Sequence, residues 1–212
     1  MRLHLEENDL WDWNPENDMH IYHGMGDELI PYENKLKINS LGLRGEEFSE
    51  KKQADVYRIF MVGGSTMLSA EVSNNSTIPS ILQKMFDSAE LNMDVEVINA
   101  GINGSNTTTE LELIKSKLIN YEPDLIILDY ADLLKTGRFN DKRHELESIY
   151  EDLRALAGEY QIPIWTASQA NRSSLEGDVE YIDASKIAES YSKVMIADFI
   201  LSLSRKNEHK AS

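Results

Sequence analysis

The sequence contains no cysteine, and this absence excludes disulfides, thiol nucleophiles and metal sites built on thiolates. Basic residues are also scarce, since 21 Lys and Arg stand against 37 Asp and Glu and leave a formal net charge of −16. A surface with this charge repels the phosphates of nucleic acids and anionic lipids. We therefore expect no general affinity for either, although a local basic patch could form.

Long apolar runs are missing as well. No stretch of the 212 residues is long enough to span a bilayer, and the chain does not open with a basic segment followed by an apolar run. These absences predict a soluble, cytoplasmic protein with no membrane partner. Apolar residues still make up 41% of the chain, which is enough for a sizeable core.

An irregular arm, residues 1–56, is expected to precede the regular elements. It is rich in turn formers and aromatic residues without a helical or strand period. His20 and His23 lie close together in this arm, but no third ligand is in view, so we expect no metal site there.

Strand and helix patterns alternate after the arm. Short apolar runs predict strands and apolar residues at three- and four-residue spacing predict helices. The expected strands are 56–62, 95–99, 123–130, 162–167 and 198–204, and the expected helices are 77–88, 108–121, 141–160 and 183–195. This alternation predicts an α/β fold with three α/β/α layers, a mostly parallel sheet of about five strands, and a single domain over residues 57–212.

About residues 1–128, the arm and the first half of this domain (57–128), resemble the SGNH (GDSL-type) hydrolases. Three ordered blocks carry the resemblance: Asn39-Ser-Leu-Gly-Leu-Arg-Gly45, Tyr57-Arg-Ile-Phe-Met-Val-Gly-Gly-Ser-Thr66 and Val97-Ile-Asn-Ala-Gly101. The resemblance implies hydrolysis of a small acyl ester without a cofactor. It implies Ser65 as the nucleophile, with the backbone N–H groups of Ser65 and Gly101 as oxyanion donors. These roles are physically sound, because fixed N–H groups stabilise a developing oxyanion.

Two groups of catalytic residues that these hydrolases possess are not found at the expected positions of this sequence. Ala131 stands about where the family has an Asn donor, and no Asp-x-x-His pair lies near the C-terminus. His209 follows the last expected strand and is one candidate base, while Asp141 and His144 have the spacing but begin a helix directly after the third strand. The candidate catalytic residues are Ser65, Gly101 and His209. An active hydrolase and an inactive relative both stay open.

The second half, residues 129–212, together with the strand that leads into it, resembles the RecA-like motor domain of the DnaB-like replicative helicases. The blocks are Leu125–Leu134, Trp165–Arg172 and Ser190–Arg205. The resemblance implies a Mg-ATP site in which Asp129 holds Mg²⁺ through water, Gln169 senses the γ-phosphate or the DNA, and Arg205 lies near an arginine that acts in trans. The implied partners are single-stranded DNA and a helicase ring.

A phosphate-binding loop for this second chemistry is missing from the sequence. Such a loop needs Gly-x4-Gly-Lys followed by Ser or Thr, whereas Gly63-Gly64-Ser65-Thr66 carries no lysine. We therefore do not expect unassisted ATP hydrolysis, and Asp129 can also be read as a solvent-facing carboxylate at a strand end. The sequence thus predicts a hybrid whose two ancestries meet within strand 123–130. An α/β domain with neither activity is the third interpretation.

Overall fold

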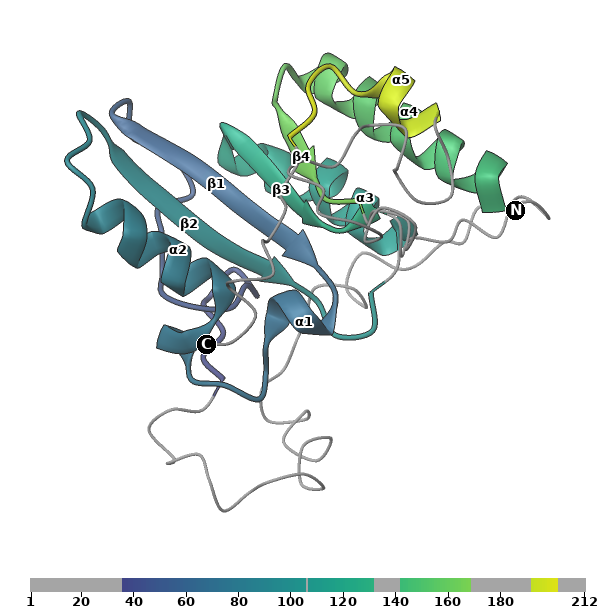
Figure 1. The fold of residues 1–212 in the computed structure, drawn as a ribbon. Helices are drawn as coiled ribbons and strands as arrows, with labels where there is room; N and C mark the ends of the chain where they lie inside the picture. The colour runs from purple at the N-terminus through teal and green to yellow at the C-terminus, as the bar shows by residue number, and fades with distance from the viewer. Residues whose placement is uncertain (1–35, 106, 132–141, 169–191, 202–212) are drawn as a thin grey trace, which may run out of the picture. The chain divides into compact units, whose positions relative to one another are not determined.

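The computed structural model describes residues 36–105, 107–131, 142–168 and 192–201 (Figure 1). The chain divides into two compact units, residues 1–129 and residues 130–212. The boundary falls directly after Asp129, at the end of the strand in which the two resemblances meet.

Three parallel strands form the sheet of the first unit. They are β1 (Val56–Gly63), β2 (Asp94–Gly101) and β3 (Leu125–Asp129), in the spatial order β2-β1-β3. The register pairs Gly63 with Gly101 on one side and with Asp129 on the other. All three carboxyl ends therefore lie at one edge, and the strand order reverses between β1 and β3. Open α/β sheets bind ligands at such a position.

The helices of the first unit are α1 (Ser65–Leu68), α2 (Ile78–Asp87) and α3 (Thr107–Ser116), with 3₁₀ turns at Asn74–Ser76 and Leu118–Tyr121. Helix α2 begins where the sequence predicts, because the Thr77 side chain accepts a hydrogen bond from the Ser80 amide (3.2 Å) and Pro79 occupies the first turn. Helix α1 has only four residues, too few to show a period, and the sequence did not predict it.

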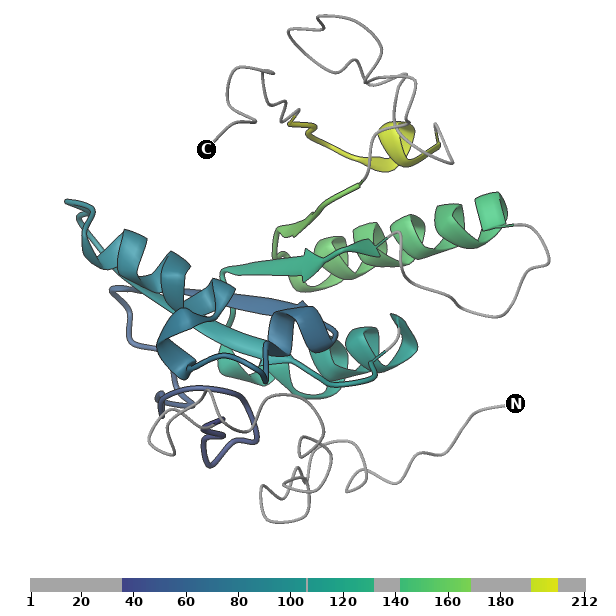
Figure 2. The ribbon, with the colours of Figure 1, turned by 60° about the horizontal axis from the view of Figure 1, so that its bottom comes forward.

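Side chains of β1 pack on both faces of the sheet, whose strands are drawn in Figures 1 and 2. On one face, Ile59 and Met61 pack with residues of α1 and α2, namely Met67, Leu82 and Phe86. Phe60 points to the opposite face, as alternation in a strand requires, and its ring lies 6.3 Å from that of Tyr121, at the end of the segment that follows α3. The predicted α/β class, parallel sheet and three layers are confirmed.

Arg58 fastens the described part of the arm to the sheet. Its side chain is only 1% exposed. Its Nε donates to Glu96 Oε2 (2.8 Å), and its terminal nitrogens donate to the carbonyl oxygens of Ser49 (2.8 Å) and Tyr121 (2.7 Å). The guanidinium also lies 5.0 Å from the Phe48 ring centroid. A single buried cation therefore joins the arm, β2 and the end of the segment after α3.

The second unit contains α4 (Lys142–Tyr160), β4 (Ile164–Thr166) and α5 (Ser192–Ile196). The predicted stripe of α4 is confirmed, since its members are all buried: Leu146, Ile149, Tyr150, Leu153 and Leu156. The strand expected at 198–204 is not formed in its described part, residues 198–201. Phe199 and Leu201 are 78% and 66% exposed there. An apolar run forms a strand only where a neighbouring strand pairs with its backbone. Residues 198–201 are not part of a strand.

No helix within the described ranges combines the length and the apolar character that crossing a membrane requires.

Candidate functional site

The turn between β1 and α1 lies at the centre of the ligand-binding edge. β1 ends at Gly63, and α1 begins at Ser65, which is exposed. A Cβ atom on Gly63 would lie 3.0 Å from the backbone oxygen of Asp129 and 3.2 Å from its Cβ, and one on Gly64 would lie 3.5 Å from Ser105 Oγ. Glycine at position 63 therefore lets the end of β3 approach the turn, and Asp129 and Ser105 flank it.

Gly101 allows α1 to lie directly on the end of β2. A Cβ atom at this position would lie 2.2 Å from the Leu68 nitrogen and 2.7 Å from the Met67 carbonyl carbon. The Gly101 N–H, which the SGNH resemblance implies as an oxyanion donor, donates here to Asn99 Oδ1 (2.9 Å). Asn99 Nδ2 in turn donates to the Met67 carbonyl (3.0 Å). In this structure the implied donor is thus used to hold α1 in place.

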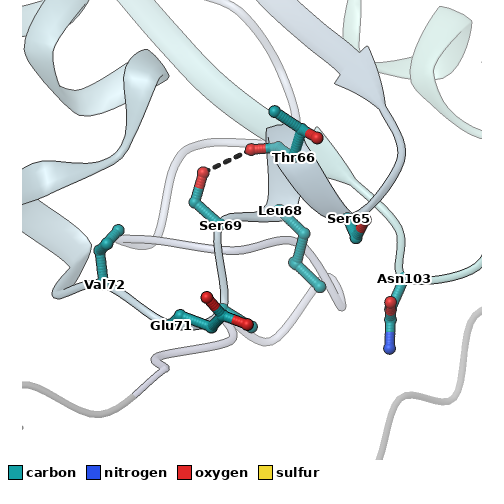
Figure 3. A pocket seen from close by; sticks show the side chains of 8 residues that line it. Ser65, Thr66, Leu68, Ser69, Glu71, Val72 and Asn103 are labelled. Carbon is teal, nitrogen blue, oxygen red and sulfur yellow. Dashed lines mark hydrogen bonds between the residues drawn. The ribbon is translucent and has the colours of Figure 1, made fainter. Parts of the chain in front are cut away.

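A pocket of about 380 Å³ lies beside α1 (Figure 3). Ser65 and Asn103 lie near one another at one end, with Leu68 beside them and Glu71 and Val72 farther along. The Ser69 hydroxyl donates to the Thr66 carbonyl (2.5 Å) and closes the short helix. The pocket combines an exposed serine hydroxyl with a carboxylate, an amide and apolar side chains.

Arg44 holds the segment that forms the far part of this pocket. Its guanidinium is buried. It donates to Asn74 Oδ1 (3.0 Å), to the carbonyl oxygen of Val72 (2.6 Å), and to the carbonyls of Leu68 and Ser69. The block at 39–45 therefore contributes by fixing the loop after α1 rather than by contacting a ligand.

Glu110 is a candidate residue that the sequence analysis missed. It lies in the first turn of α3, is 3% exposed, and accepts a hydrogen bond at Oε1 from the Ser105 hydroxyl (2.6 Å). Burial is the largest influence and raises the pKa of Glu110. The Ser105 hydrogen bond lowers it, and the charge of Asp129 raises it again. Glu110 shares a helix face with the buried Leu113 and Ile114, and a charge on an apolar face was the available signal.

Some residues of the predicted hydrolase site and one residue of the predicted nucleotide site lie at the carboxyl edge of the sheet. Asp129 pairs there with Gly63, two residues before Ser65. His209, Gln169 and Arg205 lie outside the described residues, and so do Asp141 and the side chain of His144. Within the described ranges, therefore, the only predicted site residues are Ser65, Gly101 and Asp129.

Solved structures that are similar to the chain include SGNH esterases. AlinE4, an SGNH-hydrolase family esterase, is 20% identical with a TM-score of 0.43 over 59% of this chain and 66% of that chain. TesA is 16% identical with a TM-score of 0.43 over 56% of this chain and 64% of that one.

Sequence comparison finds helicase relatives. The DnaB-like replicative helicase of Enterobacteria phage T4 is 34% identical over 107 residues, which are 49% of this chain and 21% of that protein. This chain thus spans about a fifth of the length of that relative. The family model of the DnaB-like helicase C-terminal domain matches residues 47–212, and so begins well before the predicted seam. The helicase resemblance is therefore confirmed, and the chain belongs to the DnaB-like helicase C-terminal domain family.

Proposed function

We propose that this chain is a nucleotide-associated module of a DnaB-like helicase assembly, in which Asp129 holds the Mg²⁺ of a nucleotide through water. Family membership supports the helicase setting. One observation supports the site: the register of β1 and β3 pairs Gly63 with Asp129 and so brings a carboxylate to the turn that leads into Ser65 and Thr66. A carboxylate beside such a turn, at the point where the strand order reverses, suits a Mg-nucleotide.

The side chains at this edge are better suited to binding Mg²⁺ than to binding the phosphates of the nucleotide. Mg²⁺ prefers oxygen ligands, keeps several waters and is usually held by one or two carboxylates together with the phosphates. Asp129 is half-buried, and the exposed hydroxyl groups of Ser65 and Thr66 follow the neighbouring strand. The turn lacks the lysine that cradles a triphosphate, so those contacts would come from another subunit of the assembly. The proposed role is Mg²⁺-dependent association with a nucleotide, without ATP hydrolysis by this chain alone.

Titration of a fluorescent ATP analogue into the full chain tests this proposal. We expect binding with Mg²⁺ that disappears with a chelator and in Asp129→Asn. The matched control is Asp55→Asn, which removes an exposed carboxylate just before β1, at the opposite end of the sheet. Binding that is indifferent to Mg²⁺, or equal in the two variants, would overturn the proposal. Adding a DnaB-like helicase to the titration shows whether a ring supplies the missing phosphate contacts.

Ester hydrolysis is a second candidate because Ser65 is exposed in the 380 Å³ pocket. In such a reaction the Ser65 oxygen would bond to the acyl carbonyl carbon while its proton passes to a base, for which His209 is the sequence candidate. The C–O bond to the alcohol would then break, and the alcohol would leave with that proton. A labelled fluorophosphonate should then modify the full chain, and the label should be lost in Ser65→Ala. Ser69→Ala, in the same pocket, is the control. An unmodified Ser65 removes this candidate and leaves the nucleotide proposal untouched.

A further inference from the structure

We propose that Glu110 is a second carboxylate ligand of a divalent-cation site, which it forms with Asp129 and the Ser105 hydroxyl at the carboxyl ends of β1 and β3. The inference rests on the proposed function, because it shares Asp129 with it. It goes further because it assigns a ligand that lies on α3 and outside the helicase blocks of the sequence.

The geometry places Asp129 and Ser105 beside one turn and links Glu110 to it through Ser105. Asp129 approaches Gly63 from β3, where a Cβ atom on that glycine would meet the Asp129 Cβ at 3.2 Å. Ser105 approaches Gly64, at 3.5 Å from the corresponding atom, and donates its hydroxyl to Glu110 Oε1 at 2.6 Å. Asp129 thus lies beside Gly63, and Glu110 is joined through the Ser105 hydroxyl to the neighbouring Gly64.

The second carboxylate oxygen of Glu110, Oε2, lacks a hydrogen-bond partner among the described residues. Oε2 is buried, and Glu110 itself is 3% exposed. Such an orphaned oxygen is rare in folded proteins and commonly marks a water or an ion. Burial, and to a smaller extent the charge of Asp129, raises the pKa of Glu110, so a cation bound at Oε2 would supply the missing contact and offset the cost of the buried charge.

The composition of the site indicates which cation fits. No group of three or more His, Cys, Asp and Glu side chains that could hold a metal occurs within the described part of the chain. A closed zinc-type site is therefore not formed by the residues that the structure describes. Two carboxylates, a hydroxyl and water suit a hard cation such as Mg²⁺ or Mn²⁺, which retains part of its hydration shell.

Binding of Mn²⁺ to the full chain without nucleotide, followed by electron paramagnetic resonance, tests the site. We expect Glu110→Gln and Asp129→Asn each to weaken binding by about tenfold or more, since even second-shell partners of metal ligands are worth that much. Glu112→Gln is the matched control, because Glu112 lies on the same helix and is exposed. It should bind like the wild type.

The outcomes separate this inference from the proposed function. Loss of Mn²⁺ in Asp129→Asn with full binding in Glu110→Gln would overturn the role of Glu110 and leave Asp129 as the Mg²⁺ acid. A wild-type chain that binds no Mn²⁺ would overturn the site outright, whereas Mg²⁺-dependent nucleotide binding would still test the proposed function. Should Glu110→Gln fail to fold, Ser105→Ala removes the third group and must also weaken Mn²⁺ binding.

Discussion

Replacing Gly101 by alanine should disrupt the packing of α1 on the sheet. The new Cβ atom would lie 2.2 Å from the Leu68 nitrogen, and real contacts of this kind are essentially never below 3.0 Å. The neighbouring atoms belong to the backbone of α1, so no side-chain rotation can relieve the clash. The helix would have to retreat by about 0.8 Å, the difference between these two distances.

The cost of that retreat follows from what holds α1. Met67 and Leu68 are 1% and 3% exposed, and the Leu68 carbonyl accepts a hydrogen bond from Arg44. Overpacking of a core costs about 1–3 kcal/mol, and loss of one buried side chain from the core costs about 1.5–3 kcal/mol. We therefore expect Gly101→Ala to lower the free energy of unfolding of the first unit by about 3 kcal/mol or more.

Urea unfolding followed by circular dichroism, with hydrogen exchange of β1 and β2 peptides to localise the change, measures this loss. The control is Gly104→Ala, where the residue has φ of +70° and nothing lies within 4 Å of the added atom. In that variant the free energy of unfolding should fall by only about 1–2 kcal/mol, the cost of holding alanine in a left-handed conformation. Equal losses in the two variants would refute the packing argument for Gly101.

Three further changes test other parts of the structure. Arg58→Met should lower the free energy of unfolding in urea by about 2–4 kcal/mol, because the partly buried carbonyl oxygens of Ser49 and Tyr121 lose their donor and Glu96 loses its ion pair. Gly158→Ala, in α4 with nothing within 4 Å, should raise the melting temperature through a gain of about 0.5–1 kcal/mol. Burial raises the pKa of Glu110, so the folded chain keeps that proton to higher pH than the unfolded chain does. The contribution of Glu110 is thus fully present below the unfolded pKa and is lost as pH rises through the folded one. The urea midpoint of the wild type, compared with that of Glu110→Gln at the same pH, should therefore decrease as the pH rises above the ordinary Glu pKa of 4.5. A difference between the two midpoints that does not change with pH would contradict this.

The sheet could be predicted from the sequence because its strands are short apolar runs with distinct ends. β1 and α4 lie within one residue of the predicted ranges, since apolar alternation or a three-to-four spacing leaves little choice. The end of α3 was placed five residues late. The apolar spacing continues through Leu118 and Ile119, but the backbone tightens into a 3₁₀ turn, and Glu122 takes a left-handed conformation with φ of +53° that stops it.

The sequence could predict only those site residues whose positions are set by the end of a strand. Ser65 and Asp129 follow strands directly, and the carboxyl ends of parallel strands share an edge. The role of Arg44 was not predictable, because its partners are backbone carbonyls that lie 24 to 28 residues later in the chain. Glu110 was missed for a similar reason, since its environment depends on Ser105, in the loop before α3, and on Asp129, at the end of β3.

Electrostatics at this edge favours one of the two candidate chemistries. Asp129 flanks the glycine turn before Ser65, and Glu110 reaches that turn through Ser105. A nearby carboxylate raises the energy of any further negative charge, and an oxyanion that forms near Ser65 would carry such a charge. The Gly101 N–H, which could have offset it, donates to Asn99 instead. A cation gains from the same two carboxylates. The described residues are therefore better suited to hold a hydrated metal ion with its nucleotide than to stabilise the intermediate of ester hydrolysis.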